Sequence, residues 1–253
     1  MKLTARFTVF GVALLSLGVF CWPLFISAAN AHQSNLAQTL FMVLMPVLIG
    51  LILVEFNAGE LHSRQIAVLG VLIALNSVIR MLGAGTGGVE TAFFLILISA
   101  YVFGPSFGYL MGTGSLLVSA LLTGGVGPWL PFQMMAAGLI GFGAGLLPHP
   151  RSKRIQLLLL SGAAVIGSFI YGGLMTMWNW PFLAGSGTSI SYVAGAPLLA
   201  NLERFITFEI VTGGLIWDLG RAVTTVILVL LTAPALQATL SRVARRAGYE
   251  TKL

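Results

Sequence analysis

Charged side chains are scarce in this sequence of 253 residues, of which Asp, Glu, Lys and Arg together make up 8%. A soluble domain carries about 25% charged residues, because its surface faces water. Hydrophobic residues make up 57% of the chain, and its mean hydropathy is +0.97. The composition therefore excludes a soluble protein and predicts an all-α integral membrane protein whose surface faces mostly lipid.

Cysteine and the common catalytic motifs are also lacking. The single Cys21 can form no disulfide within the chain and no cysteine-based metal site. The histidines His32, His62 and His149 lie far apart, and the sequence contains no His-Glu-x-x-His motif and no Gly-x-x-x-x-Gly-Lys-[Ser/Thr] phosphate loop. We therefore expect no metal, no cofactor and no ATP site, so a transport function would need an external energy source.

Apolar runs separated by polar or glycine-rich turns divide the chain into eight candidate membrane spans. A membrane helix needs about 20 mostly apolar residues. The motif Ala29-Asn30-Ala31 resembles a signal-peptidase site, but the preceding run is longer than the apolar part of most signal peptides, which favours a retained first span. The predicted spans are Phe7–Ala28, Leu36–Phe56, Gln65–Leu82, Thr91–Phe103, Phe107–Leu122, Leu130–Leu147, Ile155–Trp178 and Asp218–Leu240.

Lysine and arginine are concentrated in the loops on one side of this eight-span arrangement. Loops of this kind face the cytoplasm, which predicts a plasma-membrane protein with both termini inside. The net charge of +6 reflects this topology rather than nucleic-acid binding, because the basic residues lie in short loops between apolar runs. The residues on the predicted cytoplasmic side are Lys2, Arg6, Arg64, Arg151, Lys153, Arg154, Arg242, Arg245, Arg246 and Lys252.

Small residues four positions apart form rows in several predicted spans. Gly108 with Gly112 is one row, and Ala137 with Gly141 and Gly145 is another. Small residues at this spacing let helix backbones approach closely in lipid. We interpret the rows as packing within the chain, and docking on another membrane protein is the alternative.

Ionisable residues outside the predicted cytoplasmic loops fall toward the outer face. Such groups are costly in a membrane and usually functional. They occur beside tryptophans and the glycine-rich turn Gly83–Gly88, where a backbone can approach a ligand closely. This predicts an outward-facing pocket covered by a lid formed by the long irregular stretch 179–217. These residues could also have purely structural roles, because Trp gathers at membrane interfaces and Asp218 could cap a helix. The candidate substrate-binding residues are Arg80, Glu90, Trp129, Gln133, Trp178, Asn179, Trp180, Glu209, Trp217, Asp218 and Arg221.

Several stretches resemble the substrate-binding S components of energy-coupling factor transporters. The run Ala67–Arg80 resembles their first core helix, and the runs Gly87–Phe94 and Val102–Gly108 resemble their second helix and tight Gly-Pro turn. The run Leu122–Gln133 continues this similarity, and Trp217–Ala222 resembles the start of their last helix. Together these stretches place the similarity over residues 64–240.

The resemblance implies a two-helix N-terminal extension at residues 1–60 and a six-helix core at 61–253. It implies a subunit that is not an enzyme and that captures a vitamin or vitamin precursor at the outer face, with cobalamin as the first candidate. Delivery would involve a transmembrane coupling protein and two cytoplasmic ATPases. Family members meet the coupling protein through an Ala-x-x-x-Ala patch, whose nearest equivalent here is Ala67, Gly70 and Ala74.

Two other functions fit the same residues. A membrane enzyme acting at the outer face would use Glu90, Glu209 or Asp218 as an acid or base and would show turnover. An assembly subunit would use its glycine rows to dock a partner and would bind no small ligand.

Overall fold

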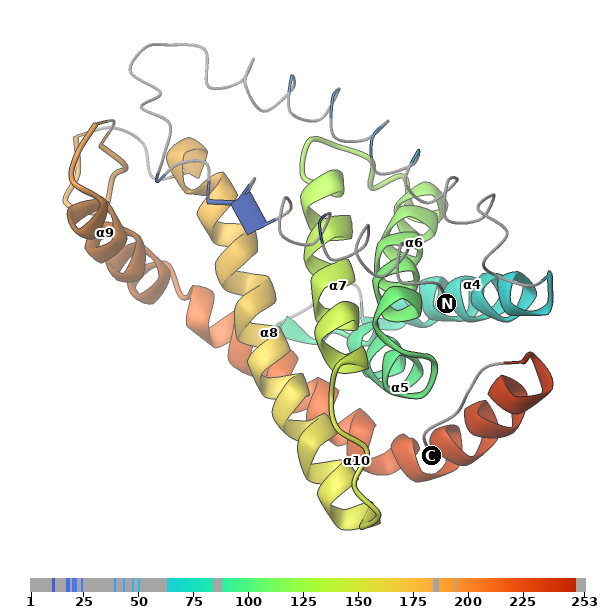
Figure 1. Cartoon of the computed structure of the whole chain (residues 1–253). Helices are drawn as coiled ribbons and strands as arrows, with labels where there is room; N and C mark the ends of the chain where they lie inside the picture. The colour runs from blue at the N-terminus through green and yellow to red at the C-terminus, as the bar shows by residue number, and fades with distance from the viewer. Residues whose placement is uncertain are drawn as a thin grey trace.

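The computed structural model describes residues 63–83, 88–183, 187–193 and 195–248, together with isolated positions between 11 and 50. The predicted spans Phe7–Ala28 and Leu36–Phe56 lie outside these continuous stretches. The described residues form helices and no strand (Figure 1). The helices are α4 (Ser63–Gly83), α5 (Phe93–Phe103), α6 (Pro105–Thr123), α7 (Leu130–Gly145), α8 (Lys153–Leu183), α9 (Leu198–Val211) and α10 (Gly214–Arg246).

Four of these helices, α4, α6, α8 and α10, are long and apolar enough to cross a membrane. Helices α5 and α7 are also apolar but shorter, with 11 and 16 residues. Each of the six coincides with one of the predicted spans after residue 64, although α8 and α10 extend beyond the apolar runs. The full eight-span arrangement stays a prediction.

Helices α6 and α7 pack with their backbones in direct contact, side by side in Figure 1. A Cβ atom on Gly108 would overlap the carbonyl group of Gly141, and one on Gly112 would overlap that of Ala137. Small residues permit this approach because they place little between the two backbones. The predicted packing of the glycine rows within the chain is confirmed for these two helices.

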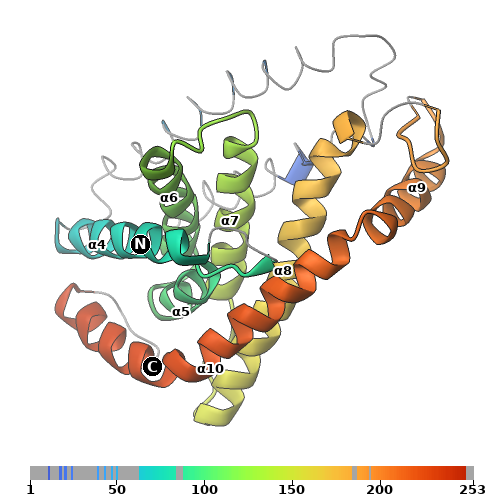
Figure 2. The ribbon, with the colours of Figure 1, turned by 180° about the vertical axis from the view of Figure 1, so that it is seen from behind.

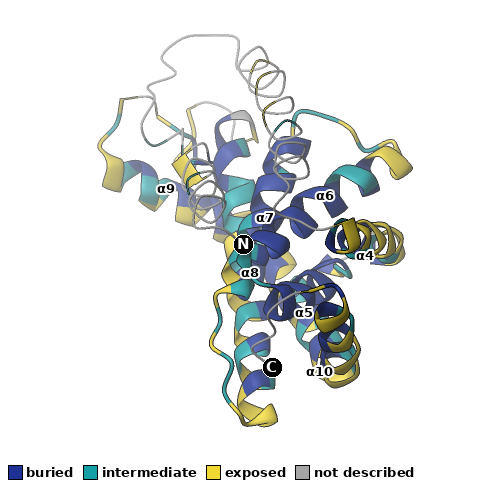
Figure 3. Cartoon of the chain, turned by 45° about the vertical axis from the view of Figure 1, so that its right-hand side comes forward, coloured by how far each residue is buried: buried dark blue, intermediate teal, exposed yellow. Residues whose placement is uncertain are grey.

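Helix α5 lies at the centre of the described structure. All eleven of its residues are buried, and it packs against α6, α7, α8 and α10 (Figure 3). A helix that is apolar on every side suits a position surrounded by other helices. It ends at Gly104, whose φ of +98° favours glycine, and Pro105 then begins α6. The Gly-Pro turn expected from the sequence is present.

Helices α8 and α10 are the longest, with 31 and 33 residues, and they pack against each other. Figures 1 and 2 show that α10 bends in its second half. Pro234 lies inside this helix and cannot donate a backbone hydrogen bond, which accounts for the bend. The last turn of α10 thereby comes close to α4, where Arg64 Nη1 lies 3.5 Å from the Arg246 carbonyl oxygen.

Among the described residues, one end of the helices carries only basic charges, and the other end carries both signs of charge. The starts of α4 and α8 and the end of α10 carry basic residues, including Arg64, Lys153 and Arg245. The opposite ends of α4 and α10 carry Arg80 and Asp218. This separation agrees with the charge pattern of the sequence. The assignment of the basic end to the cytoplasm stays a prediction.

The segment 179–217 contains more helix than the sequence suggested. Helix α8 continues to Leu183, α9 occupies Leu198–Val211, and α10 already begins at Gly214. The expectation of one long irregular stretch was therefore wrong. Helix α9 was missed because polar residues interrupt its apolar face, so it has no continuous apolar run. The role of the segment as a lid stays a prediction.

Candidate functional site

Asp218 and Arg221 form an ion pair in the first turns of α10, three residues apart on one helix face. Arg221 also donates a hydrogen bond to the Ser168 carbonyl oxygen of α8 at 3.2 Å. Its guanidinium carbon lies 4.9 Å from the centre of the Tyr171 ring, which is a cation–π distance. Gly172 makes room for the Asp218 carboxylate, because a Cβ atom there would overlap it. The pair thus joins α10 to α8.

A second pair of opposite charges links α4 to the turn before α5. Arg80 Nε lies 4.0 Å from Glu90 Oε1, and Arg80 Nη1 donates a hydrogen bond to Ser119 Oγ at 3.0 Å. Glu90 Oε1 also accepts a hydrogen bond from the Ala92 backbone N–H at 3.2 Å. Both side chains are part-buried, with 21% and 13% exposed. Solvent or a ligand can therefore still reach this pair.

Tyr171 lies between the two pairs. The fully buried phenol is within electrostatic range of Glu90, Arg80 and Arg221, and its ring packs edge-on against Phe93 at 4.8 Å. We define Arg80, Glu90, Tyr171, Asp218 and Arg221 as the polar cluster. Sequence reasoning missed Tyr171, since a tyrosine in an apolar run is ordinary at a membrane interface.

A close backbone contact brings the two halves of the polar cluster together. Gly88 has a φ of +79°, and a Cβ atom there would lie 2.7 Å from the Trp217 carbonyl oxygen and 3.3 Å from Gly220 Cα. The sequence suggested that this glycine-rich turn approaches a ligand. Its last glycine instead approaches the first turn of α10, and residues 84–87 lie outside the described part.

Glu209 at the end of α9 lies beside the polar cluster. Only 6% of the residue is exposed, and a Cβ atom on Gly214 would overlap its carboxylate. Burial raises the pKa of the Glu209 carboxyl above its ordinary value, the nearby Thr176 hydroxyl offsets part of this shift, and the Asp218 charge adds to it. Helix α9 lies outside the candidate membrane spans.

The predicted aromatic residues form groups of their own. Trp178 stacks on Phe132 with ring centres 4.0 Å apart, inside the main core. Trp180 is fully buried in a smaller core, packs against Tyr192 and Phe205, and donates a hydrogen bond to the Ile190 carbonyl oxygen at 2.8 Å. These contacts hold the segment after α8, together with α9, against the end of α8.

Four further candidates lie nearer the surface. Trp129 and Trp217 are 46% and 48% exposed, and Gln133 and Asn179 are half-buried. Trp129 covers Gly127 and donates a hydrogen bond to the Gly125 carbonyl oxygen at 3.3 Å. The structure thus brings together Arg80, Glu90, Asp218 and Arg221, with Glu209 beside them, whereas Trp129, Trp178 and Trp180 make their contacts in separate groups.

The predicted docking residues share one exposed face of α4. Ala67, Gly70 and Ala74 are all exposed, and a Cβ atom on Gly70 would meet no atom within 4 Å. Val71 and Val78 continue this apolar surface, with 67% and 55% exposed. Figure 3 shows α4 with an exposed outer side. The opposite face of α4 is buried against α6.

These observations define a multi-pass membrane protein whose described part is helical, with opposite charges paired at one end of an apolar bundle. The family model for the ECF transporter substrate-specific component matches residues 64–239. The chain belongs to this family and is a substrate-capture subunit of an ECF transporter, a class of transport subunits rather than enzymes. No curated protein and no solved structure matches the chain.

Proposed function

We propose that the chain captures a vitamin or vitamin precursor at the polar cluster, on the membrane face opposite its basic end. The single observation that carries this proposal is the meeting of two pairs of opposite charge around Tyr171 in a chain with 8% charged residues. Charged groups are costly in an apolar bundle and usually functional, which favours a ligand-binding role.

The chemistry of the cluster favours a polar or zwitterionic ligand. Arg80 and Arg221 offer donors for carboxylate or phosphate oxygens, while Glu90 and Asp218 accept hydrogen bonds from amine or amide groups. The exposed rings of Trp129 and Trp217 offer flat surfaces for a ring system. Cobalamin is our first candidate, on the family resemblance, and the segment containing α9 would act as the lid.

Delivery completes the proposed function. The exposed face with Ala67, Gly70 and Ala74 would dock the transmembrane coupling protein, which works with two cytoplasmic ATPases. In this proposal the chain resides in the plasma membrane with eight spans, and residues 1–60 form a two-span hairpin before the core at 61–253. Both termini would lie in the cytoplasm.

A thermal-shift screen of the purified protein in detergent against water-soluble vitamins and their precursors tests the binding proposal. A ligand that binds only the folded state stabilises it by about 2.7 kcal/mol at a hundredfold excess over its Kd, which raises Tm. Cobalamin is included. We expect one compound to raise the Tm of the wild type, and Arg221→Ala to abolish the effect.

Two further variants make the result decisive. Removing one partner of a buried ion pair can itself cost about 3–5 kcal/mol, so the more exposed Arg80→Gln provides a milder test of the same cluster. Arg151→Ala removes an exposed arginine at the opposite, basic end, for which no ion pair is found among the described residues, and it should keep the full shift. A shift that survives both Arg221→Ala and Arg80→Gln would place the ligand elsewhere. A well-folded sample that responds to no compound would contradict the proposal.

A further inference from the structure

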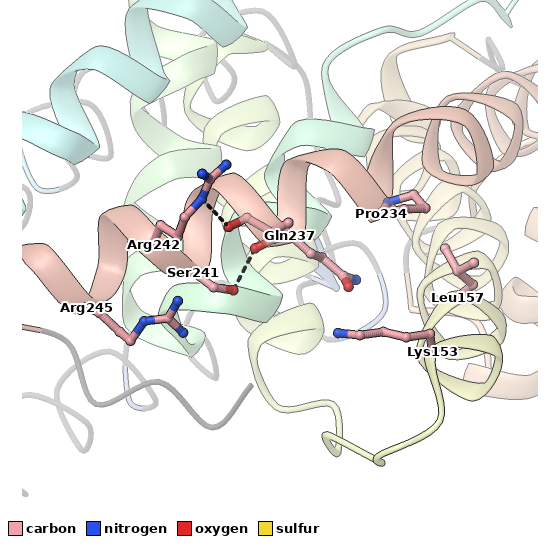
Figure 4. Close-up of a pocket in the computed structure, with 8 residues that line it drawn as sticks. Lys153, Leu157, Pro234, Gln237, Ser241, Arg242 and Arg245 are labelled. Atoms are coloured by element: carbon pink, nitrogen blue, oxygen red, sulfur yellow. Dashed lines mark hydrogen bonds between the residues drawn. The ribbon is translucent and has the colours of Figure 1, made fainter.

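A pocket lies at the basic end of the helices, away from the polar cluster. It has a volume of about 590 Å³ and lies between the start of α8 and the second half of α10 (Figure 4). We call it the basic pocket. Its lining residues are Lys153, Leu157, Pro234, Gln237, Ala238, Ser241, Arg242 and Arg245.

The lining of the basic pocket carries cations and no carboxylate. Lys153, Arg242 and Arg245 contribute three positive charges, and no ion pair involves them within the described part of the chain. Lys153 also opens α8, whose first backbone N–H groups add a partial positive charge. The electrostatic potential of the pocket therefore favours an anion.

Gln237 provides an independent sign of a ligand. The residue is 4% exposed, and its Nε2 has no hydrogen-bond partner among the described residues. Buried amide groups are nearly always hydrogen-bonded, because an unsatisfied donor is costly. Figure 4 shows the end of this side chain facing the ammonium group of Lys153. Gln237 Nε2 thus lacks an acceptor beside the Lys153 ammonium group, whose own hydrogen bond, to Gln156 Oε1, is long at 3.5 Å.

The rest of the lining is apolar. Leu157, Pro234 and Ala238 extend the pocket toward the middle of the two helices, both of which are candidate membrane spans. A free inorganic anion would gain nothing from this surface, whereas an acyl chain would bury apolar area against it. Basic residues at the end of a membrane helix also lie at the depth of lipid head groups.

We propose that the basic pocket binds a phosphate group, and specifically the phosphodiester of an anionic phospholipid. The phosphate accepts hydrogen bonds from Gln237 Nε2 and from Lys153, and Arg245 lies at the rim, while the acyl chain packs along Leu157 and Pro234. Arg242 contributes mainly charge, because its Nε donates to the Ala238 carbonyl oxygen at 3.3 Å and its Nη2 lies 3.5 Å from Thr239 Oγ1.

Titrations of the full chain in neutral detergent test this site. Native mass spectrometry would follow three probes: dihexanoyl-phosphatidylglycerol, dihexanoyl-phosphatidylcholine and inorganic phosphate. We expect phosphatidylglycerol to bind with the lowest Kd. The double variant Lys153→Gln/Arg245→Gln should raise that Kd at least about tenfold, and Gln237→Leu should raise it severalfold by removing the buried donor.

A matched control separates the pocket from general surface charge. The double variant Arg151→Gln/Arg154→Gln removes two exposed cations from the same end of the chain, but neither residue lines the pocket. It should leave the Kd unchanged. Equal losses in the two double variants, or no effect of Gln237→Leu in a variant with wild-type Tm, would overturn the proposal. Equal affinity for inorganic phosphate would assign the pocket to the free ion instead of a lipid.

Discussion

At the scale of single residues, the polar cluster shows how this chain keeps charges in an apolar bundle. Asp218 is 3% exposed, yet its charge meets Arg221 on the same helix face and its carboxylate occupies the space above Gly172. Desolvating two charges costs several kcal/mol each, so such a pair persists only with close geometry and additional hydrogen bonds. Arg221 has both, through Ser168 and Tyr171.

Glu209 should make the stability of the protein depend on pH. Because its pKa is raised in the folded state, the carboxyl holds its proton to higher pH there than in the unfolded chain. The folded state is therefore favoured below the unfolded pKa and loses stability as pH rises through the folded pKa. Glu209→Gln keeps a neutral group, so we expect a higher Tm at pH 7 and a flatter Tm profile between pH 4 and pH 7 on thermal unfolding in detergent.

Glu203→Gln is the control for this prediction. Glu203 is on the same helix, but its side chain is exposed. The dependence of Tm on pH in the Glu203→Gln variant should therefore match that of the wild type. A Glu209→Gln variant whose Tm falls with pH as steeply as the wild type would show that the Glu209 carboxyl is already neutral or well solvated.

The sequence predicted the charged members of the polar cluster but not the residues that connect them. Arg80, Glu90, Asp218 and Arg221 stand out because a charge in an apolar run is rare. Tyr171 and the Ser168 carbonyl oxygen could not be found in this way. A buried tyrosine and a backbone acceptor carry no compositional signal, and their role depends on which helix faces which.

At the scale of helices, the contact between α6 and α7 depends on glycines that let the two backbones touch. Gly141→Ala would drive a methyl group into the Gly108 carbonyl group of α6, and neither backbone can yield cheaply. Overpacking of this kind costs about 1–3 kcal/mol, so Tm should fall. Thermal unfolding in detergent measures the change.

Gly143 provides the matched control on the same helix. A Cβ atom there would meet nothing within 4 Å, and the residue is exposed. Gly143→Ala should therefore be neutral or stabilise α7 by up to about 1 kcal/mol, through helix propensity alone. Similar losses of Tm in both variants would show that the contact between α6 and α7 tolerates a methyl group.

Helices were predictable where apolar runs are long and uninterrupted, as in α4, α5 and α6. The predictions were less complete where a helix continues past its apolar run or has only one apolar face. Helix α9 buries Asn201, Phe205, Phe208 and Glu209, a spacing of four, three and one residues that defines one face of a helix. Two of these buried residues are polar, which explains why a search for apolar runs does not detect this face.

At the scale of the whole molecule, the exposed face of α4 is the surface we expect to meet the coupling protein. Gly70→Leu would add a large side chain at the centre of this face, at a position where a Cβ atom meets no atom of the described chain within 4 Å. We expect at least about a tenfold loss of co-purification with the coupling protein and its ATPases, because close helix contact in lipid requires small residues. Ligand binding by the isolated chain should persist.

Gly162→Leu on α8 makes the same change at another exposed position with free space around it. Its co-purification should match the wild type. If both variants assemble normally, the docking surface lies on another part of the chain, and if both fail equally, added bulk anywhere in the membrane region disturbs assembly. Wild-type Tm in both variants shows that folding is unaffected.

The backbone contact at Gly88 couples the turn between α4 and α5 mechanically to the start of α10. One side of this contact leads within two residues to Glu90, and the other lies in the first turn of α10, one residue before Asp218. Because the two backbones are in direct contact, with no flexible side chain between them to absorb a movement, a displacement of one backbone displaces the other. If a ligand binds at Asp218 as we propose, a shift of α10 would be transmitted through Gly88 toward Glu90 and α4, the helix that we expect to dock the coupling protein.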